Sequence, residues 1–280
     1  GAMAMLLRDA LRPNLVQTVE HIPAFVHGGP FANIAHGTNS LMATQLGLKL
    51  ADYFIIEAGF GSDLGAEKFF DIVCRQGLSP NAAVMVVSIR ALKVHGGVSS
   101  GDAQAGQPNV KAVRQGLANL KKHVDNVALF NVPVVVALNR FSSDTDAEID
   151  VVESFCRQQN LPFAVANVWA EGGDGGIELA GKVVDVIHNS DVKLSYLYEP
   201  KMGVKKKIET IAQKMYGADE VVYTVTAEDD IRIIKKLGLE DLLICMAKTP
   251  YSLSDDAALK GRPTDFKITI KQIRISAGAG

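Results

Sequence analysis

The most informative stretch of this chain is Pro133-Val134-Val135-Val136-Ala137-Leu138-Asn139-Arg140-Phe141, in which a continuous apolar run is followed at once by polar residues. Unbroken apolar strands are typical of parallel sheets that helices cover on both faces. Four other runs resemble it, at residues 23–27, 53–57, 83–88 and 163–168. Apolar residues at helical spacing predict intervening helices near 39–51, 66–76, 109–129, 146–159 and 176–189. This alternation predicts an α/β fold with a doubly wound, mostly parallel sheet.

Beyond Ser190 the predicted elements become shorter, which indicates a smaller C-terminal α+β domain. They comprise helices near 204–215 and 229–237 and strands at 221–223, 242–246 and 266–270. We therefore expect domain boundaries of 4–190 and 191–280. Gly1-Ala2-Met3 is typical of a protease scar, and the sequence ends directly after a strand-like alternation. We expect the chain to be a piece of a longer protein.

Composition excludes several classes of protein. The 280 residues are 48% hydrophobic and 21% charged, which excludes disordered and fibrous chains. A net charge of -2 gives no long-range attraction for nucleic acid or for an anionic membrane. No apolar run reaches the roughly 18 residues that a bilayer requires. Three widely spaced cysteines without a CxxC pair argue against disulfides and zinc. These features predict a cytoplasmic protein without nucleic-acid or membrane partners.

Ligands of open parallel sheets bind at the carboxyl ends of the strands, so the loops there hold the candidate residues. After the predicted second strand, Glu57 and Asp63 stand where a hydrolase or ligase would hold magnesium or order a water molecule. They are our catalytic candidates, although a helix cap would equally explain Asp63. Residues 90–97 carry cations and a glycine pair, which is typical of an anion-binding loop and also of ordinary surface.

Two further strand ends carry side chains that suit planar ligands. The amide of Asn139 can both donate to and accept from the edge of a nucleotide base. Trp169, the only tryptophan, stands among glycines at the end of the last strand and could stack on a ring. Packing of Trp169 beneath its own loop is the alternative. Gly176 to Lys182 has the spacing of a phosphate loop, but Val183 replaces the required hydroxyl, so we interpret this segment as a helix.

Eight motifs together carry a resemblance to a known family. They are HGGPFANIAHG, EAGFGSDLGAEKFFDI, IRALKVHGG, PVVVALNRF, VWAEGGDGG, AQKMYGAD, CMAKTPYSLSDD and RISAGAG. In this order they resemble formate-tetrahydrofolate ligase, also called formyltetrahydrofolate synthetase, from Leu6 to Gly280. NRF followed by SAGAG is more similar to the bacterial single-function type. The resemblance is to the C-terminal half of that enzyme.

This resemblance implies ATP-dependent joining of formate to tetrahydrofolate through formyl phosphate, giving 10-formyltetrahydrofolate, in a homotetramer that uses Mg²⁺ and a monovalent cation. It also implies that Phe141 and Trp169 hold the pterin ring, that Asn139 lies by the adenine, and that Ser276 and Gly278 line the nucleotide. The family's phosphate loop and its formyl-phosphate arginine have no counterpart here. We therefore expect this chain alone to be an inactive fragment of the enzyme.

Two other hypotheses compete with this interpretation. The chain could be a folding or assembly module of the same enzyme that binds no ligand. Considered without the resemblance, it could also be a dinucleotide-binding oxidoreductase. That second hypothesis is weak, because no GxGxxG follows the first predicted strand and no acidic residue is identifiable about 20 positions further on. Thermal stabilisation by a folate, ATP or NAD would distinguish the three.

Overall fold

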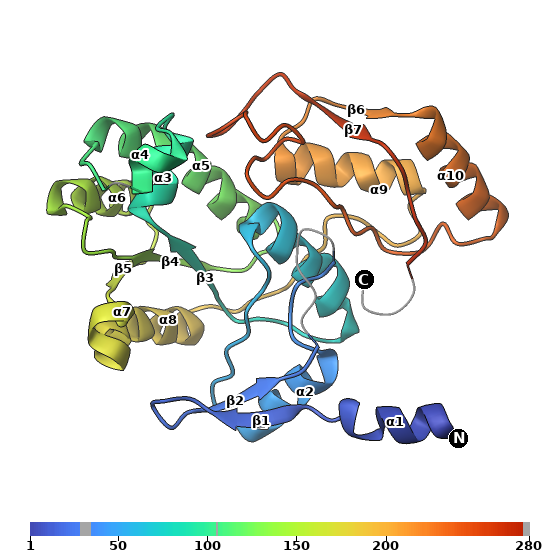
Figure 1. Ribbon diagram of the computed structural model, residues 1–280, viewed down its shortest axis with the longest axis horizontal. Coiled ribbons are helices and arrows are strands. Elements are labelled where there is room, and N and C mark those ends of the chain that lie inside the picture. The colour runs from blue at the N-terminus through green and yellow to red at the C-terminus, as the bar shows by residue number, and fades with distance from the viewer. Residues whose placement is uncertain (29–34, 105, 277–280) are drawn as a thin grey trace.

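A three-stranded parallel sheet lies in the left half of the computed structural model in Figure 1, which describes residues 1–28, 35–104 and 106–276. Its strands are β3 (Ala83–Val87), β4 (Val134–Asn139) and β5 (Phe163–Ala166), in the order β3-β4-β5. In the register, Val87 pairs with Leu138, and Asn139 pairs with Ala166. The first five residues of β4 are buried, as the apolar run 133–138 predicts. The carboxyl ends of the three strands therefore meet at one edge of the sheet.

Helices cover both faces of this sheet, which confirms the α/β class (Figure 1). One side carries α3 (Ile89–His95), α4 (Ser100–Gln104), α5 (Val110–Ala128) and α6 (Asp146–Gln158). The other side carries α7 (Val168–Glu171) and α8 (Ile177–Asn189). The predicted helices at 109–129, 146–159 and 176–189 are thus confirmed to within about one residue at each end.

The helices on the first side begin at polar capping residues that the sequence supplies. The Ser88 hydroxyl accepts a hydrogen bond from the N–H of Ala91 at the start of α3. The side chain of Asn109 accepts from the N–H of Ala112 at the start of α5. Thr145 and Glu148 form a reciprocal capping box at the start of α6. Each cap satisfies backbone groups that would otherwise lack partners in the first turn.

Two predicted strands of the parallel sheet are wrong. Residues 23–26 form β2 (Pro23–Val26), which pairs antiparallel with β1 (Asn14–Gln17) in a separate hairpin. Residues 53–57 lie outside any strand. A strand requires a neighbouring ladder of N–H and C=O groups. Among the described residues, β1 supplies that ladder to β2, and no strand supplies one to 53–57.

The segment between the hairpin and β3 is helical. Helix α2 (Leu41–Leu50) confirms the helix predicted near 39–51. The next predicted helix begins earlier than expected, at Gly61, and contains irregular turns. These turns are η1 (Gly61–Ala66), η2 (Phe69–Val73) and η3 (Cys74–Gln76). The first two are π-helical, a geometry that sequence periodicity at 3.6 residues does not reveal.

The C-terminal part packs against the same hydrophobic core. It comprises α9 (Val204–Ile211), η5 (Ala212–Tyr216), β6 (Glu220–Tyr223), α10 (Val225–Lys236) and β7 (Lys267–Ile270). Strands β6 and β7 form a small parallel sheet. One buried cluster includes both Val127 on α5 and Tyr198, on either side of residue 190. The division into domains 4–190 and 191–280 stays a prediction.

The predicted strand at 242–246 is also wrong, and side chains explain why. The N–H of Ile244 donates to the hydroxyl of Tyr198 at 3.1 Å. The ammonium group of Lys207, which is fully buried, donates to the carbonyls of Glu240 and Leu242, each at 2.6 Å. Side chains rather than a neighbouring strand thus satisfy these backbone groups, so this apolar segment needs no sheet ladder.

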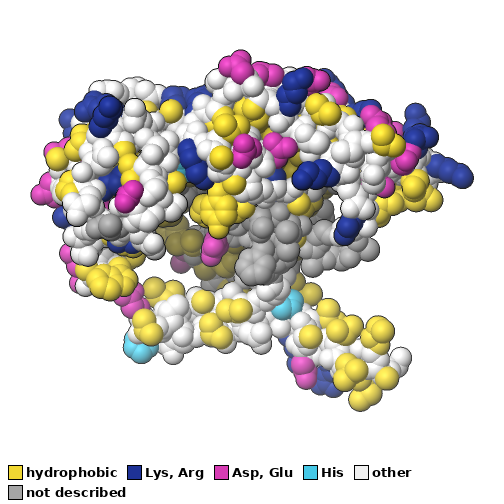
Figure 2. Space-filling view, turned by 45° about the horizontal axis from the view of Figure 1, so that its top comes forward, with side chains coloured by type: hydrophobic (Ala, Val, Ile, Leu, Met, Phe, Trp, Pro, Cys, Tyr) yellow, Lys and Arg dark blue, Asp and Glu magenta, His cyan; other side chains and the backbone are white. Residues whose placement is uncertain are grey.

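The face in Figure 2 shows hydrophobic side chains gathered on the projecting helix α1 (Ala2–Ala10). Met3, Met5 and Leu6 on this helix are 74%, 79% and 82% exposed, and no residue of α1 is buried. The helix therefore contributes no buried side chain to the core. Among the described residues, no helix combines the length and the apolar composition that crossing a membrane would demand.

Helices α3 and α5 cross in close contact because two glycines leave room for the backbone. A Cβ atom on Gly96 would lie 1.9 Å from the carbonyl oxygen of Ala112. A Cβ atom on Gly116 would lie 2.0 Å from that of Leu92. Both separations are far below van der Waals contact, and the obstructing atoms belong to the backbone. The crossing therefore fixes α3 against α5.

The substitution Gly116→Ala is expected to lower the free energy of unfolding by about 1 to 3 kcal/mol, since the added methyl group forces the two helices apart. Gly181→Ala is the matched control, because a Cβ atom on Gly181 in α8 would have no neighbouring heavy atom within 4 Å among the described residues. That variant is expected to be unchanged or slightly more stable. Urea unfolding of both variants measures the difference, and equal stability would contradict the close crossing.

Candidate active site

The structure brings the ends of the three strands together, as the parallel topology requires. Arg90 follows β3 in the first turn of α3, Phe141 follows β4, and Trp169 follows β5 in α7. The N–H of Arg140 donates to the carbonyl of Ala166 at 3.0 Å, which joins the last two strand ends. The guanidinium carbon of Arg90 lies 4.2 Å from the centre of the Phe141 ring, which joins the first two. This edge is the candidate site.

Phe141 stands in a tight turn that its own neighbours stabilise. Its N–H donates to the carboxylate of Asp144 at 2.9 Å, and its carbonyl accepts from the N–H of Asp144 at 3.0 Å. Asp144 is buried, and burial raises the pKa of its carboxyl group, although the N–H of Phe141 acts in the opposite direction. The backbone of Phe141 is therefore held in place before any ligand arrives.

A buried ion pair lies beneath this turn. Lys93 on α3 and Glu148 on α6 are 1% and 0% exposed, and their charged groups lie 2.7 Å apart. Burial by itself would raise the pKa of Glu148, but Lys93 and the N–H groups of Asn109 and Thr145 outweigh it and lower the pKa. Residues 90–95 are helical rather than a loop, and Lys93 is internal. The interpretation of 90–97 as an open anion-binding loop is therefore wrong.

Trp169 is 88% exposed in the short helix α7. The loop around it closes on itself, because the N–H of Asn167 donates to the carbonyl of Gly175 at 3.0 Å. The hairpin reaches the same loop, where Glu20 accepts a hydrogen bond from the N–H of Gly173 at 2.7 Å. Trp169 thus does not pack beneath its own loop, and its indole ring is accessible to a ligand.

The segment with phosphate-loop spacing is part of a helix. Residues 177–189 form α8, and Lys182 is exposed in its middle. Gly176 immediately precedes the helix rather than opening a phosphate-binding turn. The segment lacks both the hydroxyl and the strand-loop-helix context that a phosphate loop needs.

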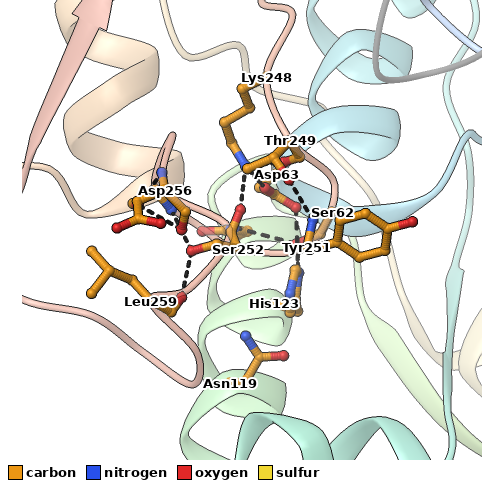
Figure 3. Close-up of polar contacts among 12 residues, drawn as sticks. Ser62, Asp63, Asn119, His123, Lys248, Thr249, Tyr251, Ser252, Asp256 and Leu259 are labelled. Atoms are coloured by element: carbon orange, nitrogen blue, oxygen red, sulfur yellow. Dashed lines mark hydrogen bonds and ion pairs between the residues drawn. The ribbon is translucent and has the colours of Figure 1, made fainter. Parts of the chain in front are cut away.

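The two carboxylates proposed as catalytic candidates lie in different environments. Glu57 is exposed, and its backbone carbonyl accepts a hydrogen bond from Thr38. Asp63 is 5% exposed in the first turn of η1, where its carboxylate lies 2.7 Å from the ammonium group of Lys248 (Figure 3). Its side chain caps no helix in this structure, so the capping explanation is replaced by a buried ion pair. The structure shows no contact between Glu57 and Asp63.

Figure 3 shows polar side chains around the Asp63 and Lys248 pair, and the buried side chains of Glu67 and Lys68 also interact electrostatically with it. His123 on α5 lies 3.9 Å from Asp63 and 2.7 Å from the hydroxyl of Ser62. Burial lowers the pKa of His123, although Asp63 acts in the opposite direction. At neutral pH His123 is therefore uncharged, and Lys248 neutralises Asp63. Within 1–28, 35–104 and 106–276, no three His, Cys, Asp or Glu side chains gather as they would to hold a metal ion.

The proposed nucleotide-binding residues are distributed over two regions. Asn139 is half-buried and ends β4, directly before the Phe141 turn. Ser276 is exposed in the segment that follows β7. Gly278 lies outside the described residues. The structure thus places Asn139 at the candidate site, beside the residues proposed to bind the pterin.

A comparison with protein families gives a match along the full length of the chain. The family described as formate-tetrahydrofolate ligase matches residues 1–280. This chain belongs to that family. The formate-tetrahydrofolate ligases join formate to tetrahydrofolate and are enzymes of one-carbon metabolism. The resemblance drawn from the eight sequence motifs is confirmed.

Two contacts of the candidate residues in this ligase chain were not anticipated from sequence. Arg90 lies against Phe141, and Lys248 pairs with Asp63. A signal for the first was present, because Arg90 directly follows a predicted strand, as Asn139 and Trp169 do. No sequence signal indicated the contact between Lys248 and Asp63. Residues 242–246 were predicted to form a strand just before Lys248, and the structure has no strand there.

Proposed function

We propose that this chain carries the pterin-binding platform and part of the adenine site of an ATP-dependent formate-tetrahydrofolate ligase. The complete reaction uses ATP to convert formate into formyl phosphate, whose formyl group passes to tetrahydrofolate. The observation that carries the proposal is Trp169, an 88% exposed indole three residues after Ala166, the strand end that the N–H of Arg140 joins to the start of the Phe141 turn. Aromatic side chains at neighbouring strand ends are suited to binding a planar heterocycle.

Each named residue has a distinct proposed task. Phe141 and Trp169 bind the two faces of the pterin ring and orient the folate. Asn139, two residues before Phe141, donates to and accepts from the edge of the adenine. Ser276 and Gly278 line the nucleotide. Burial of the pterin between two aromatic faces excludes water from that ring and orients N10, the atom outside the pterin ring that accepts the formyl group.

Of the two carboxylates, only that of Glu57 can contact a ligand without the loss of an ion pair such as the one between Asp63 and Lys248. Asp63 is neutralised by Lys248 and lies in a buried setting. Mg²⁺, a monovalent cation, a homotetramer and a cytoplasmic location are further parts of this proposal, and they derive from the family resemblance. The described residues do not by themselves fit a metal ion, so no step here is assigned to one.

Folic acid is expected to quench the fluorescence of Trp169 saturably, since Trp169 is the only tryptophan of the chain. Phe141→Ala is expected to raise the dissociation constant about 5- to 150-fold, the equivalent of about 1 to 3 kcal/mol of base stacking. Trp169→Ala, followed by calorimetry, is expected to weaken binding by a similar factor. Tyr53→Ala, which removes an exposed aromatic ring outside these loops, is the control and should bind as the unaltered chain does.

Absence of quenching by folic acid, in a chain shown to be folded, would contradict the proposal. The chain would then be better described as a folding or assembly module of the ligase. Stabilisation against thermal unfolding by NAD but not by folic acid would instead favour a dinucleotide-binding protein.

A further inference from the structure

Arg90 is held at the candidate site without an ion pair. Its guanidinium carbon lies 4.2 Å from the ring centre of Phe141, and Nη2 donates to the hydroxyl of Ser143 at 3.5 Å. Its Nε atom is buried and has no hydrogen-bond partner among the residues described. No carboxylate in that part of the chain lies within 4.0 Å of its nitrogens. The Phe141 ring and the Ser143 hydroxyl are thus the groups in contact with the guanidinium, and the Asp144 carboxylate acts on its charge from farther away.

The helix that bears Arg90 is anchored firmly. Ser88 caps α3, and the buried pair of Lys93 and Glu148 joins α3 to α6, where Glu148 also accepts from the N–H of Thr145 just after the Phe141 turn. The Gly116 crossing fixes α3 against α5. Arg90 therefore extends from a rigid element onto the ring, while the backbone of Phe141 is held separately by Asp144. Backbone and ring are restrained by two independent sets of contacts.

An aromatic ring has two faces, and a cation at 4.2 Å occupies one of them. We propose that Arg90 is a positioning residue, which covers one face of Phe141, fixes the ring and leaves the opposite face for the pterin. This inference rests on the proposed folate-binding function and adds a residue to it. The planar guanidinium suits this task better than an ammonium group, because it can lie parallel to the ring and is more weakly hydrated.

The test compares Arg90→Met and Arg90→Lys with the unaltered chain. Binding is measured by calorimetry with two probes, folic acid and the uncharged 6-methylpterin. Arg90→Met is expected to weaken binding of both probes by about 3- to 10-fold. Arg90→Lys is expected to recover part of that loss. Arg157→Met is the matched control, because Arg157 is an exposed arginine on α6 that pairs with Glu153. It should bind both probes as the unaltered chain does.

A double substitution separates positioning from a direct contact. If Arg90 acts through the ring, Arg90→Met should add no further loss in a chain that already carries Phe141→Ala. A loss confined to folic acid would show that Arg90 binds a glutamate carboxylate, and it would overturn the inference. Unchanged affinity of both Arg90 variants, beside normal binding by the unaltered chain, would overturn this inference alone. Failure of the unaltered chain to bind either probe would overturn the proposed function and this inference together.

Discussion

The 280-residue chain by itself is expected to form no more ADP from ATP, formate and tetrahydrofolate than a blank without protein. Phosphoryl transfer depends on donors held around the β and γ phosphates, normally a glycine-rich loop with its lysine, together with a metal ion. No GxxxxGK[ST] sequence occurs anywhere in the 280 residues. The nearest match ends in Lys182 and Val183, and both residues lie within helix α8.

The loss expected from these missing groups is large. Removing a single donor that stabilises developing charge typically costs a factor of about 100 to 1,000 in turnover. Here the whole phosphate-binding loop is lacking, so turnover should fall below detection. The measurement is formate-dependent ADP release by protein that is free of host enzyme. A complete enzyme of the same family is the positive control. Robust turnover by the chain alone would show that the phosphate site has been placed wrongly.

Folate binding and catalysis are therefore expected to separate in this chain. The proposed pterin-binding residues lie at one edge of the sheet, whereas phosphoryl transfer normally uses a glycine-rich loop with its lysine, and the 280 residues contain no such motif. Quenching of Trp169 by folic acid, measured beside the ADP assay on the same sample, would demonstrate this separation directly. A sample that neither binds folic acid nor turns over would support the assembly-module hypothesis instead.

The second large effect is expected at the buried pair of Asp63 and Lys248. Lys248→Met should lower the free energy of unfolding by about 3 to 5 kcal/mol, because it leaves the carboxylate of Asp63 buried without its neutralising charge. The side chains of the two residues are 7% and 4% exposed, and their charged groups lie 2.7 Å apart. Burial is the largest cause that lowers the pKa of the His123 imidazole, and it persists in the variant, so His123 replaces the charge of Lys248 only in part. Urea unfolding at neutral pH measures the loss.

Two controls make this prediction specific. Glu57→Gln changes the exposed carboxylate of the same loop, and its effect on stability should stay within about 0.5 kcal/mol. The double variant Asp63→Leu with Lys248→Met removes both charges and is expected to recover much of the stability, as buried pairs replaced by apolar residues often do. Full stability of Lys248→Met would show that Asp63 does not depend on this pair. Asp63 would then be as strong a catalytic candidate as Glu57.

The α/β class could be predicted from sequence because its determinants are local. The apolar run 133–138 and the apolar spacing along residues 109–129 are properties of consecutive residues, and they became β4 and α5. The motifs that contain Asn139, Phe141 and Trp169 likewise predicted candidate residues at the ends of two strands, and their role in binding stays a prediction. Parallel topology then brings these ends to one edge of the sheet, whatever the details of packing.

Pairing between distant segments could not be predicted in this way. Residues 23–27 and 53–57 have the composition of buried strands, yet one entered a hairpin and the other no strand at all. An apolar run indicates only that burial of the segment is favourable. Whether it becomes a strand depends on which N–H and C=O groups lie beside it, and only the tertiary structure decides that.

The candidate site likewise depends partly on local sequence and partly on contacts between distant segments. The sequence by itself determined which residues stand at the strand ends, and through its motifs it determined the family. Only the tertiary structure decided that Asp63 is buried against Lys248 while Glu57 is exposed, and that Arg90 covers the ring of Phe141. The physical reason is that a side chain's charge and accessibility depend on which atoms surround it. In a folded chain those atoms come from segments that are far apart in sequence.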